Sequence, residues 1–520
     1  MVTRLTAASY TILLNLVHVS APSQPAHTSV PVRTLFKSIV QGSGLYSVAT
    51  IGQRIASVIL LPILTRFLTP NDYGVMELLD QISSVLSTLL GGNFSSALGY
   101  FYFADNSTER RRRVVGTTVV GAALIGATAG LICWPFAGQL SRLVFGSDIA
   151  KFYLRILFLC MPLSFALESF FSWLRVEDRP GVFVIWSFCR LGITIVAVVV
   201  LVAVLNLKIL GMLLSSFTMF VIVCTGFGFY CWKQVRPAFE FSLFVRMAKF
   251  AAPIGLSLMA VFIINFGDRF FLRPYVTMSA LGLYALSYKI GMLVSVIYGS
   301  FNSYWAAQVY GILKRDDAAA IFGRIQTYTT LGLVFICMGL VVAAKPMLRL
   351  MTTPAYYGAA RLVPLIVLAY FIRSMGDFFR SLYYVSGHPG ADAACNWLGA
   401  AICLTGYFLL IPRFGVWGAA EATVIAFALI ATVCLTWTHR LWPYRLDTVR
   451  LSKIGLAALA VLVPYSLVNV TSLIGQIAWG GAVMLAFPVL LWMMRFPSPG
   501  ERDAMASAVR RVLRFGAAAA

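Results

Sequence analysis

The stretch FLTPNDYGVMELL (67–79) returns later in the chain as YVTMSALGLYALS (275–287). Gly74 recurs as Gly282, and the threonine five residues before it and the leucine four residues after it also recur, all 208 residues further on. The first copy places a polar, proline-containing turn between two long apolar runs, a pattern that predicts a tight connection between two helices. The sequence therefore predicts that one hairpin element occurs twice.

A second pair of segments repeats at almost the same offset. ESFFSWLRVEDRPG (168–181) aligns with DFFRSLYYVSGHPG (377–390), and Glu168 then matches Asp377 at a spacing of 209 residues. Two matches that agree to within one residue favour an internal duplication. The alternative explanation is that any two connections between membrane helices use similar turn residues.

The composition excludes an ordinary soluble enzyme. Of the 520 residues, 60% are hydrophobic and only 12% are charged, and the mean hydropathy is +0.84. Soluble domains carry about a quarter charged residues. Apolar runs of roughly 20 residues recur along the chain, which is the length that an α-helix needs to cross a bilayer. Their helical periodicity argues against a barrel, so we predict an all-α integral membrane protein.

We predict about 14 transmembrane helices in this chain. Their expected bounds are 39–64, 74–103, 114–136, 149–174, 181–206, 209–232, 247–272, 279–310, 322–344, 361–387, 390–411, 416–438, 453–470 and 473–494. The offset between the repeats covers six of these helices, and an even number keeps the two copies parallel. They are then related by a pseudo-two-fold axis along the membrane normal.

The repeats also predict how the chain is divided. We expect a disordered leader, an N-terminal six-helix bundle, a C-terminal six-helix bundle, a two-helix C-terminal appendage and a basic cytoplasmic tail. These five parts are expected at 1–34, 35–240, 241–440, 441–495 and 496–520.

The charges in the loops predict the orientation. The loops on one side carry 24 Lys and Arg residues against 10 on the other, and the richer side faces the cytoplasm. Most of the net charge of +22 is explained by this orientation bias and by a role for basic residues in attracting anionic membrane lipids. No nucleic acid is therefore expected as a partner. The nine cysteines are scattered without a CxxC pair, so we expect neither a metal nor a cofactor.

The run GLYSVATIGQRIASVILLPILTRFLTPNDYGVMELLD (44–80) resembles the start of bacterial polysaccharide transporters, the O-antigen-type flippases of the multidrug/oligosaccharidyl-lipid/polysaccharide exporter superfamily. LLIPRFGVWGAAEAT (409–423) extends a resemblance that covers about 35–440. The resemblance implies two six-helix bundles in a V shape, often with two extra helices. It also implies transfer of undecaprenyl-pyrophosphate-linked oligosaccharide from the cytoplasmic to the periplasmic leaflet of the bacterial inner membrane, beside a glycan polymerase or export machinery.

Several charged residues are expected at bilayer depth, where each is a functional candidate because an unpaired charge there is costly. One guanidinium group can donate two parallel hydrogen bonds to phosphate oxygens. The deep cations therefore predict a cationic cavity for the pyrophosphate. Two deep acids are candidates for coupling to H+ or Na+. The cations are Arg54, Arg190, Lys289, Arg373 and Arg380, and the acids are Glu168 and Asp377.

Structural explanations remain open for these residues. Arg373, Asp377 and Arg380 fall on one stripe of a helix, so the aspartate can neutralise its neighbours, although two arginines still leave the stripe positive. Lys289 can pair with a nearby acid, and for Glu421 we favour a hydrogen bond between packed helices.

Other polar residues have simpler expectations. Glu77 and Asp80 lie nearer a helix end, where long side chains can reach the interface. Four tyrosines could stack on sugar rings, although packing in the protein is favoured for most of them. They are Tyr288, Tyr370, Tyr383 and Tyr384.

Two other functions compete with a flippase. A multidrug or organic-cation antiporter of the same superfamily needs an acidic cavity, whereas the deep cations here outnumber the deep acids. A membrane-embedded glycan polymerase or glycosyltransferase usually needs a sizeable extramembrane loop. The longest outer loop, expected at 345–361, holds no Asp, Glu, His or Cys, and the sequence shows no phosphate-binding loop or metal cluster. We therefore do not expect an enzyme.

The loop charges make the topology testable. We expect both termini to be cytoplasmic, so alkaline phosphatase fused after residue 495 stays inactive, while a fluorescent protein fused there emits. A fusion after residue 340 faces outward and gives the opposite pattern. Phosphatase activity from the C-terminal fusion contradicts the topology.

Overall fold

The computed structural model describes residues 52, 60–91, 94–104, 107–235, 238–312, 315–385, 389–441, 444, 446–468 and 470–497. Within these residues all regular secondary structure is helical. Eleven helices are long and apolar enough to cross a membrane, and a twelfth span appears when Pro354–Arg361 and Val363–Tyr383, bent by 46°, count as one. The predicted class of all-α membrane protein is confirmed.

The predicted spans from 114–136 onward each coincide with one of these spanning helices, whereas 39–64 lies largely outside the described residues. The elements in chain order are α3 (Pro70–Leu86), η1 (Ser87–Gly91), α4 (Phe94–Phe103), α5 (Thr108–Cys133), α6 (Ala137–Phe145), η2 (Asp148–Ala150), α7 (Lys151–Val176), α8 (Pro180–Val198), η3 (Val199–Val204), α9 (Lys208–Val235), α10 (Phe241–Phe266), α11 (Asp268–Leu272), α12 (Met278–Gly291), α13 (Leu293–Ile312), α14 (Ala318–Met351), η4 (Pro354–Arg361), α15 (Val363–Val385), α16 (Pro389–Phe414), α17 (Val416–Leu441), α18 (Thr448–Leu467) and α19 (Leu473–Met493).

The predicted span 74–103 is not one continuous α-helix. It begins as α3, widens into the π-helix η1 and resumes as α4. The sequence Gly-Gly-Asn at 91–93 follows the widened turn, and glycine is a poor helix former in a helix interior. Hydropathy alone does not register this interruption, because the residues on both sides are apolar.

The prediction of an outer loop at 345–361 is also wrong. Helix α14 continues to Met351, and a 3₁₀ helix, η4, covers most of the rest. The last turns of α14 carry Lys345 and Arg349, and the Arg349 guanidinium donates to the carbonyl of Thr471 in the α18–α19 connection. Long cationic side chains can reach out of the bilayer while their helix stays in it. A helix end placed at the first charged residue therefore comes too early in the sequence.

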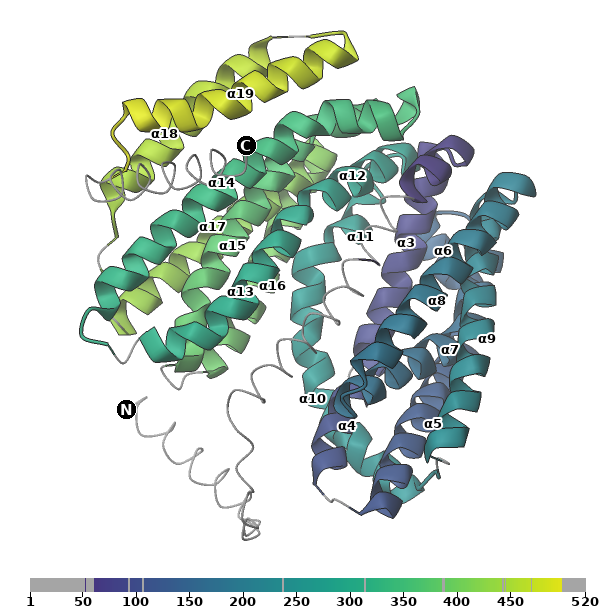
Figure 1. Ribbon diagram of the computed structural model, residues 1–520. Helices are drawn as coiled ribbons and strands as arrows, with labels where there is room; N and C mark the ends of the chain where they lie inside the picture. The colour runs from purple at the N-terminus through teal and green to yellow at the C-terminus, as the bar shows by residue number, and fades with distance from the viewer. Residues whose placement is uncertain are drawn as a thin grey trace, which may run out of the picture.

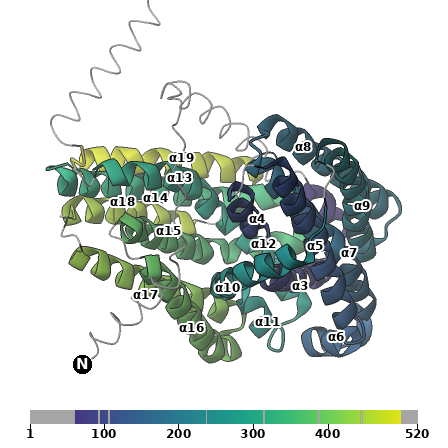
Figure 2. The same cartoon turned by 90° about the horizontal axis from the view of Figure 1, so that it is seen from below.

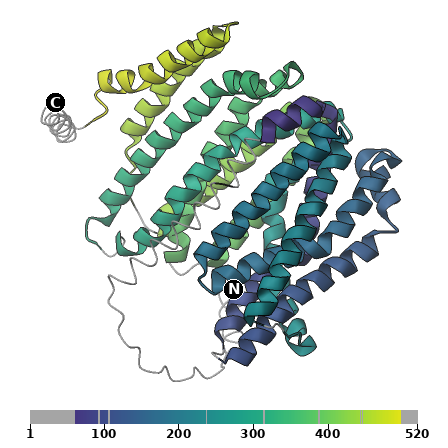
Figure 3. The ribbon, with the colours of Figure 1, turned by 45° about the vertical axis from the view of Figure 1, so that its right-hand side comes forward.

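The helices gather in two groups. Figure 1 shows α3–α9 on one side and α13–α17 on the other, with α10–α12 between them, and Figure 2 shows the same order from below. The C-terminal pair, α18 and α19, runs along the outer edge of the second group (Figure 3). It packs on α14 around a separate apolar cluster that includes Val342, Val461 and Phe487. The division into two superposable six-helix bundles stays a prediction.

The two copies of the repeated stretch lie against each other, where α3 crosses α12. A Cβ atom added to Gly74 would meet the carbonyl oxygen of Met278 at 2.1 Å, and one added to Gly282 would meet the carbonyl oxygen of Pro70 at 2.1 Å. Met278 is the counterpart of Pro70 at the same offset of 208 residues. The contact is therefore reciprocal, as a local two-fold axis between the glycines would make it.

The two helices also start in the same way. Thr69 caps α3, and its hydroxyl accepts a hydrogen bond from the backbone N–H of Asp72. Thr277 caps α12 and accepts from the backbone N–H of Ala280. Threonine is a favourable N-cap because its oxygen satisfies an N–H group that has no partner inside the helix. The repeated threonine therefore fixes the start of both helices. It also fixes how far along its helix each glycine lies.

The end of the molecule next to this crossing is closed by contacts to backbone carbonyls. Thr65 donates to the carbonyl of Met351 (3.1 Å), and the hydroxyl of Tyr356 donates to the carbonyl of Leu68 (2.9 Å). These residues lie in or beside segments that the loop charges predict to face away from the cytoplasm. These two hydrogen bonds therefore join the segment before α3 to α14 and η4 at the predicted outer end.

At the opposite end, Glu240 connects α5 to the start of α10. Its carboxylate lies 3.8 Å from the guanidinium of Arg110 and 3.5 Å from that of Arg113. The hydrogen bond from Ser242, together with these two guanidinium groups, lowers the pKa of the Glu240 carboxyl below its ordinary value. The connection between the two predicted bundles is thus held by ion pairs at the predicted cytoplasmic end.

The helix crossing predicts a position-specific effect of a single methyl group. Gly74→Ala forces α3 away from α12 and should destabilise the protein by about 1–3 kcal/mol, the usual cost of overpacking. Gly99→Ala on α4 is the matched control, since no heavy atom lies within 4 Å of its added Cβ. The measurement is the thermal unfolding midpoint of both purified variants. Equal midpoints contradict a tight crossing.

Candidate functional site

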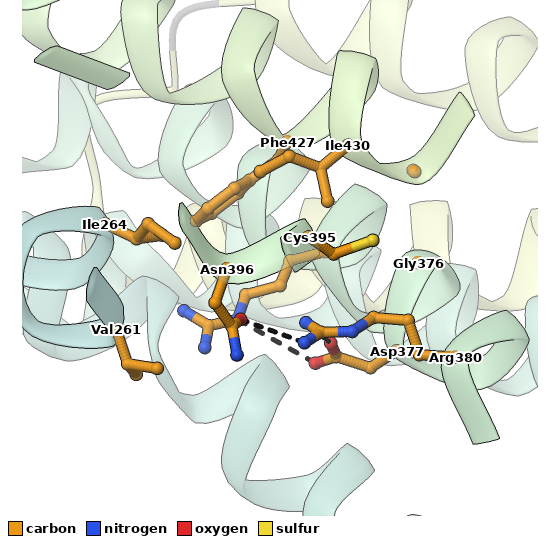
Figure 4. A pocket seen from close by; sticks show the side chains of 11 residues that line it. Val261, Ile264, Gly376, Asp377, Arg380, Cys395, Asn396, Phe427 and Ile430 are labelled. Atoms are coloured by element: carbon orange, nitrogen blue, oxygen red, sulfur yellow. Dashed lines mark hydrogen bonds and ion pairs between the residues drawn. The ribbon is translucent and has the colours of Figure 1, made fainter. Parts of the chain in front are cut away.

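A polar cavity of about 350 Å³ lies between α10, α13, α15 and α16. A narrower void continues from it towards Phe427 on α17, and Figure 4 shows Arg380, Asp377 and Asn396 converging there. The lining starts at mid-helix and runs towards the helix ends that are predicted to face the cytoplasm. Its polar members are Asn302, Tyr310, Arg373, Asp377, Arg380, Ser381, Asp392 and Asn396.

Arg380 is the most heavily bonded residue of this cavity. Its Nε donates to Oδ1 of Asp392 (2.8 Å), its Nη2 to Oδ1 of Asn396 (2.9 Å) and its Nη1 to Oδ1 of Asp377 (3.3 Å). The sequence prediction paired Arg380 with Asp377 but missed Asp392. The signal was available, because Asp392 and Asn396 are four residues apart and share one face of α16.

Arg373 is held more loosely. Its Nη1 donates to the side-chain oxygen of Asn265 on α10. Its Nε lies 3.8 Å from Asp377, which is too far for a hydrogen bond, and its guanidinium stands 5.4 Å above the ring of Phe427. A quarter of the side chain is accessible. The guanidinium therefore keeps donors that a ligand in the cavity can reach.

A second charged cluster is fully buried between α3 and α11. Arg269 is 1% exposed, and its guanidinium bonds Oε1 of Glu77 (3.1 Å) and Oδ1 of Asp268 (2.6 Å). The hydroxyl of Tyr284 donates to the other oxygen of Asp268, and the ring of Tyr288 lies 4.3 Å from the Arg269 guanidinium. Buried charges persist only where partners of this kind compensate for lost hydration.

This cluster corrects two expectations. Glu77 does not reach the interface but is buried against Arg269. Arg269, which is one of the ten Lys and Arg residues counted on the outer side, is itself buried and does not lie in an outer loop. Arg269 also connects the cluster to the cavity. Its Nη1 donates to the backbone carbonyl of Asn265 (2.9 Å), whose side chain bonds Arg373. Polar contacts therefore run without interruption from α3 to α16.

Arg190 and Glu168, which were predicted as a phosphate ligand and a coupling acid, form a pair of their own. Nη1 of Arg190 on α8 lies 3.4 Å from Oε1 of Glu168 on α7. The Arg190 guanidinium also stands 5.8 Å from the ring of Phe171. The structure brings Arg373 and Arg380 into one cavity, whereas Arg190 belongs to the other group of helices. Arg54 lies outside the described residues.

Lys289 on α12 is exposed, and its Nζ stands 4.7 Å above the ring of Tyr73. It interacts electrostatically with Glu77 and Asp80 of α3, which favours the explanation that nearby acids balance its charge. Glu421 is half-buried and makes no hydrogen bond to another residue that the structure describes. The helix-packing hydrogen bond expected for Glu421 is therefore not observed.

The aromatic residues divide clearly. Tyr288, Tyr370 and Tyr383 are buried, which agrees with packing in the core, and the side chain of Tyr384 lies outside the described part. Tyr310, which the sequence did not single out, lines the polar cavity and is half exposed. Across the described ranges, no group of three or more His, Cys, Asp or Glu side chains could hold a metal ion.

Comparison with known proteins identifies the family of this chain. Residues 39–305 match the family model described as polysaccharide biosynthesis protein, which confirms the resemblance predicted from 44–80. The chain is 22% identical over 319 residues to the succinoglycan biosynthesis transport protein ExoT of Rhizobium meliloti, covering 60% of this chain and 62% of that relative. It is 23% identical over 295 residues to the Lsg locus putative protein 1 of Haemophilus influenzae, covering 53% and 67%. The match thus spans less than two thirds of the first relative.

Solved structures share the fold at low identity. The lipid II flippase MurJ in an inward closed conformation aligns with a TM-score of 0.66 and 16% identity, over 87% of this chain and all of that chain. An inward-facing multidrug resistance MATE family transporter of the MOP superfamily aligns with a TM-score of 0.59 and 14% identity, over 75% and 94%. Both similarities concern the fold.

The buried cluster yields a stability prediction. Arg269→Met leaves two carboxylates without their counter-charge and should cost about 3–5 kcal/mol. Adding Glu77→Gln to that variant removes one orphaned charge and should recover part of the loss. Arg66→Met, at an exposed position, serves as the control. Thermal unfolding midpoints and membrane abundance are measured, and an Arg269→Met variant as stable as the control contradicts the assignment.

Proposed function

Because the chain belongs to the polysaccharide biosynthesis protein family, we propose that it is a flippase for lipid-linked oligosaccharide. It would move an undecaprenyl-pyrophosphate-linked glycan from the cytoplasmic to the periplasmic leaflet of a bacterial inner membrane. One observation carries the proposal: a polar cavity containing two arginines lies among membrane-length helices and extends towards the predicted cytoplasmic ends. Charged side chains at that depth usually face a water-filled cavity or pair with one another, and they mark candidate substrate pathways.

The names of related proteins support a lipid-linked cargo. One relative is named a transport protein of succinoglycan biosynthesis, and one protein of the same fold is named a lipid II flippase. In our proposal the pyrophosphate meets Arg373, whose donors are partly free, and the other deep cations Arg54, Arg190, Lys289 and Arg380 add positive charge along the path.

The lipid chain needs a separate, apolar environment. A cavity of about 720 Å³ lies between α14, α15, α17 and α18, and its walls are mostly apolar side chains such as Met338, Phe371 and Leu462. We propose that this surface, continuous with the bilayer, accommodates isoprenoid or acyl chains while the head group occupies the polar cavity. Membrane lipids would fill it in the absence of substrate.

Coupling to an ion can act through the two paired acids. Asp377 bonds Arg380 and lies near Arg373, and Glu168 pairs with Arg190. Binding of H+ or Na+ by either carboxylate weakens its hold on an arginine and frees that arginine for the pyrophosphate. We propose this exchange as the link between the ion gradient and the substrate.

An organic-cation antiporter is the second candidate, because proteins of that type share the fold. Its cavity should carry excess negative charge. Here the arginines at 373 and 380 balance the aspartates at 377 and 392, so the cavity offers a cation no net attraction. Because a charge-balanced cavity favours neither a cation nor an anion, the flippase is better supported by the family match and the names of the relatives.

The proposal predicts a graded effect at Arg373. Arg373→Ala should lose a charge-assisted hydrogen bond worth roughly 1.5–3 kcal/mol, which corresponds to about ten- to a hundredfold in affinity. Arg373→Lys keeps the charge without the planar fork and should restore export only partly. The measurement is surface glycan in cells that depend on the variant.

Arg413→Ala is the charge-matched control, because Arg413 is exposed at the other end of α16. Membrane abundance is checked for each variant by blotting. Full glycan export by an Arg54→Ala and Arg373→Ala double variant, at normal abundance, shows that these cations do not bind the substrate.

A further inference from the structure

Most of the donors of Arg380 are already bonded to partners in its own protein. Besides its bonds to the side chains of Asp377, Asp392 and Asn396, its Nη2 also donates to the backbone carbonyl of Asp392 (3.2 Å). A guanidinium has five N–H donors, and these contacts occupy four of them. With one donor left, Arg380 cannot bind a phosphate through two donors without giving up one of these partners, so its main role is to orient the acids and the amide around the cavity.

The balance of charges in the cavity also argues against a phosphate ligand at Arg380. Two arginines face two aspartates, and the carboxylates of Asp377 and Asp392 remain 33% and 21% exposed. An ionised carboxylate only accepts hydrogen bonds, and the oxygens of a pyrophosphate also only accept. Those two groups repel each other, whereas a hydroxyl group can donate to the carboxylate. The ligand complementary to these oxygens is therefore rich in donors without being anionic.

The remaining polar lining can both donate and accept. Asn302 receives a hydrogen bond from Tyr298 on its oxygen (3.4 Å), and its amide nitrogen has no partner among the described residues. Asn396 on α16 contributes a second amide, whose oxygen accepts from Arg380 and whose nitrogen makes a long contact of 3.5 Å to Asp392. Tyr310 presents a ring that is 50% exposed and makes no hydrogen bond to another described residue. Amides match hydroxyl groups, and an aromatic face covers the apolar face of a sugar ring.

We propose that this cavity is the subsite for the sugar nearest the carrier, bound by Asn302, Tyr310, Asp377, Asp392 and Asn396, while the pyrophosphate sits beside Arg373. The inference rests on the proposed function and assigns its cavity to uncharged hydroxyl groups. The cavity volume of about 350 Å³ falls in the range of small-ligand sites. A site built from hydrogen-bonding groups discriminates strongly against ligands that leave those groups unpaired, so this subsite would select the glycan.

The test separates the sugar from the pyrophosphate. Purified full-length protein in lipid nanodiscs is titrated with undecaprenyl pyrophosphate, either bare or carrying one glucose, galactose or N-acetylglucosamine. Asn302→Leu removes an amide outside the ion-pair network. It should weaken binding of the preferred glycosylated carrier about three- to tenfold, the value of one hydrogen bond, and leave the bare carrier within about twofold.

Tyr310→Leu should act in the same direction, and Tyr310→Phe, which keeps the ring, should retain more of the affinity for the glycosylated carrier than Tyr310→Leu does. Unfolding midpoints confirm that these surface changes leave the fold intact. Equal weakening for the bare and glycosylated carriers overturns the inference in favour of a pyrophosphate site. Unchanged affinity for both carriers in the Asn302→Leu and Tyr310→Leu variants also overturns it.

The proposed function fails in a different way. If the unaltered protein binds neither carrier and instead takes up an organic cation such as ethidium, the flippase itself is excluded. If it binds all the carriers equally, the flippase stands and the sugar subsite is refuted.

Discussion

The close crossing of α3 and α12 is the contact on which the rest of the structure depends. Only glycine at 74 and 282 lets each backbone approach a carbonyl oxygen of the other helix. One turn after Gly74, the same face of α3 presents Glu77 to Arg269, which also pairs with Asp268. Three ionised groups can stay away from water there because the crossing fixes the distances between them. A wider separation would admit water or leave a charge unpaired.

The crossing is linked to the polar cavity by a single turn of helix. Asn265 and Arg269 are four residues apart, and the backbone of the first accepts from the second while its side chain accepts from Arg373. A rearrangement that moved α3 relative to α12 would disturb Glu77, Arg269 and then Arg373. Coupling of this kind requires a contiguous element with two arrangements. The polar chain from α3 to α16 is a physical candidate for it.

Much of the architecture could be predicted from the sequence, because helical periodicity and loop charge are local properties. The repeated threonine and glycine identified both hairpins, and the structure adds that the two copies touch each other. The charged cluster could not be predicted in the same way. Arg269 follows an apolar helix and a glycine, so hydropathy places it at a membrane boundary, whereas packing buries it. The sequence places Asp392 near the start of a helix, where acidic residues are common. The structure shows that α15 brings Arg380 into contact with it.

The pairing of arginines with aspartates has a consequence for transport. A flippase has to return empty, and an uncompensated arginine at bilayer depth would cost several kcal/mol on every return. Asp377 and Asp392 remove that cost when no substrate is present, since they satisfy Arg380 and draw Arg373 towards the cavity wall. In the proposed flippase the pyrophosphate would compete with Asp377 for Arg373, which would keep its binding moderate. Moderate binding is what a carrier needs, because a head group held by free arginines would be slow to leave on the other side.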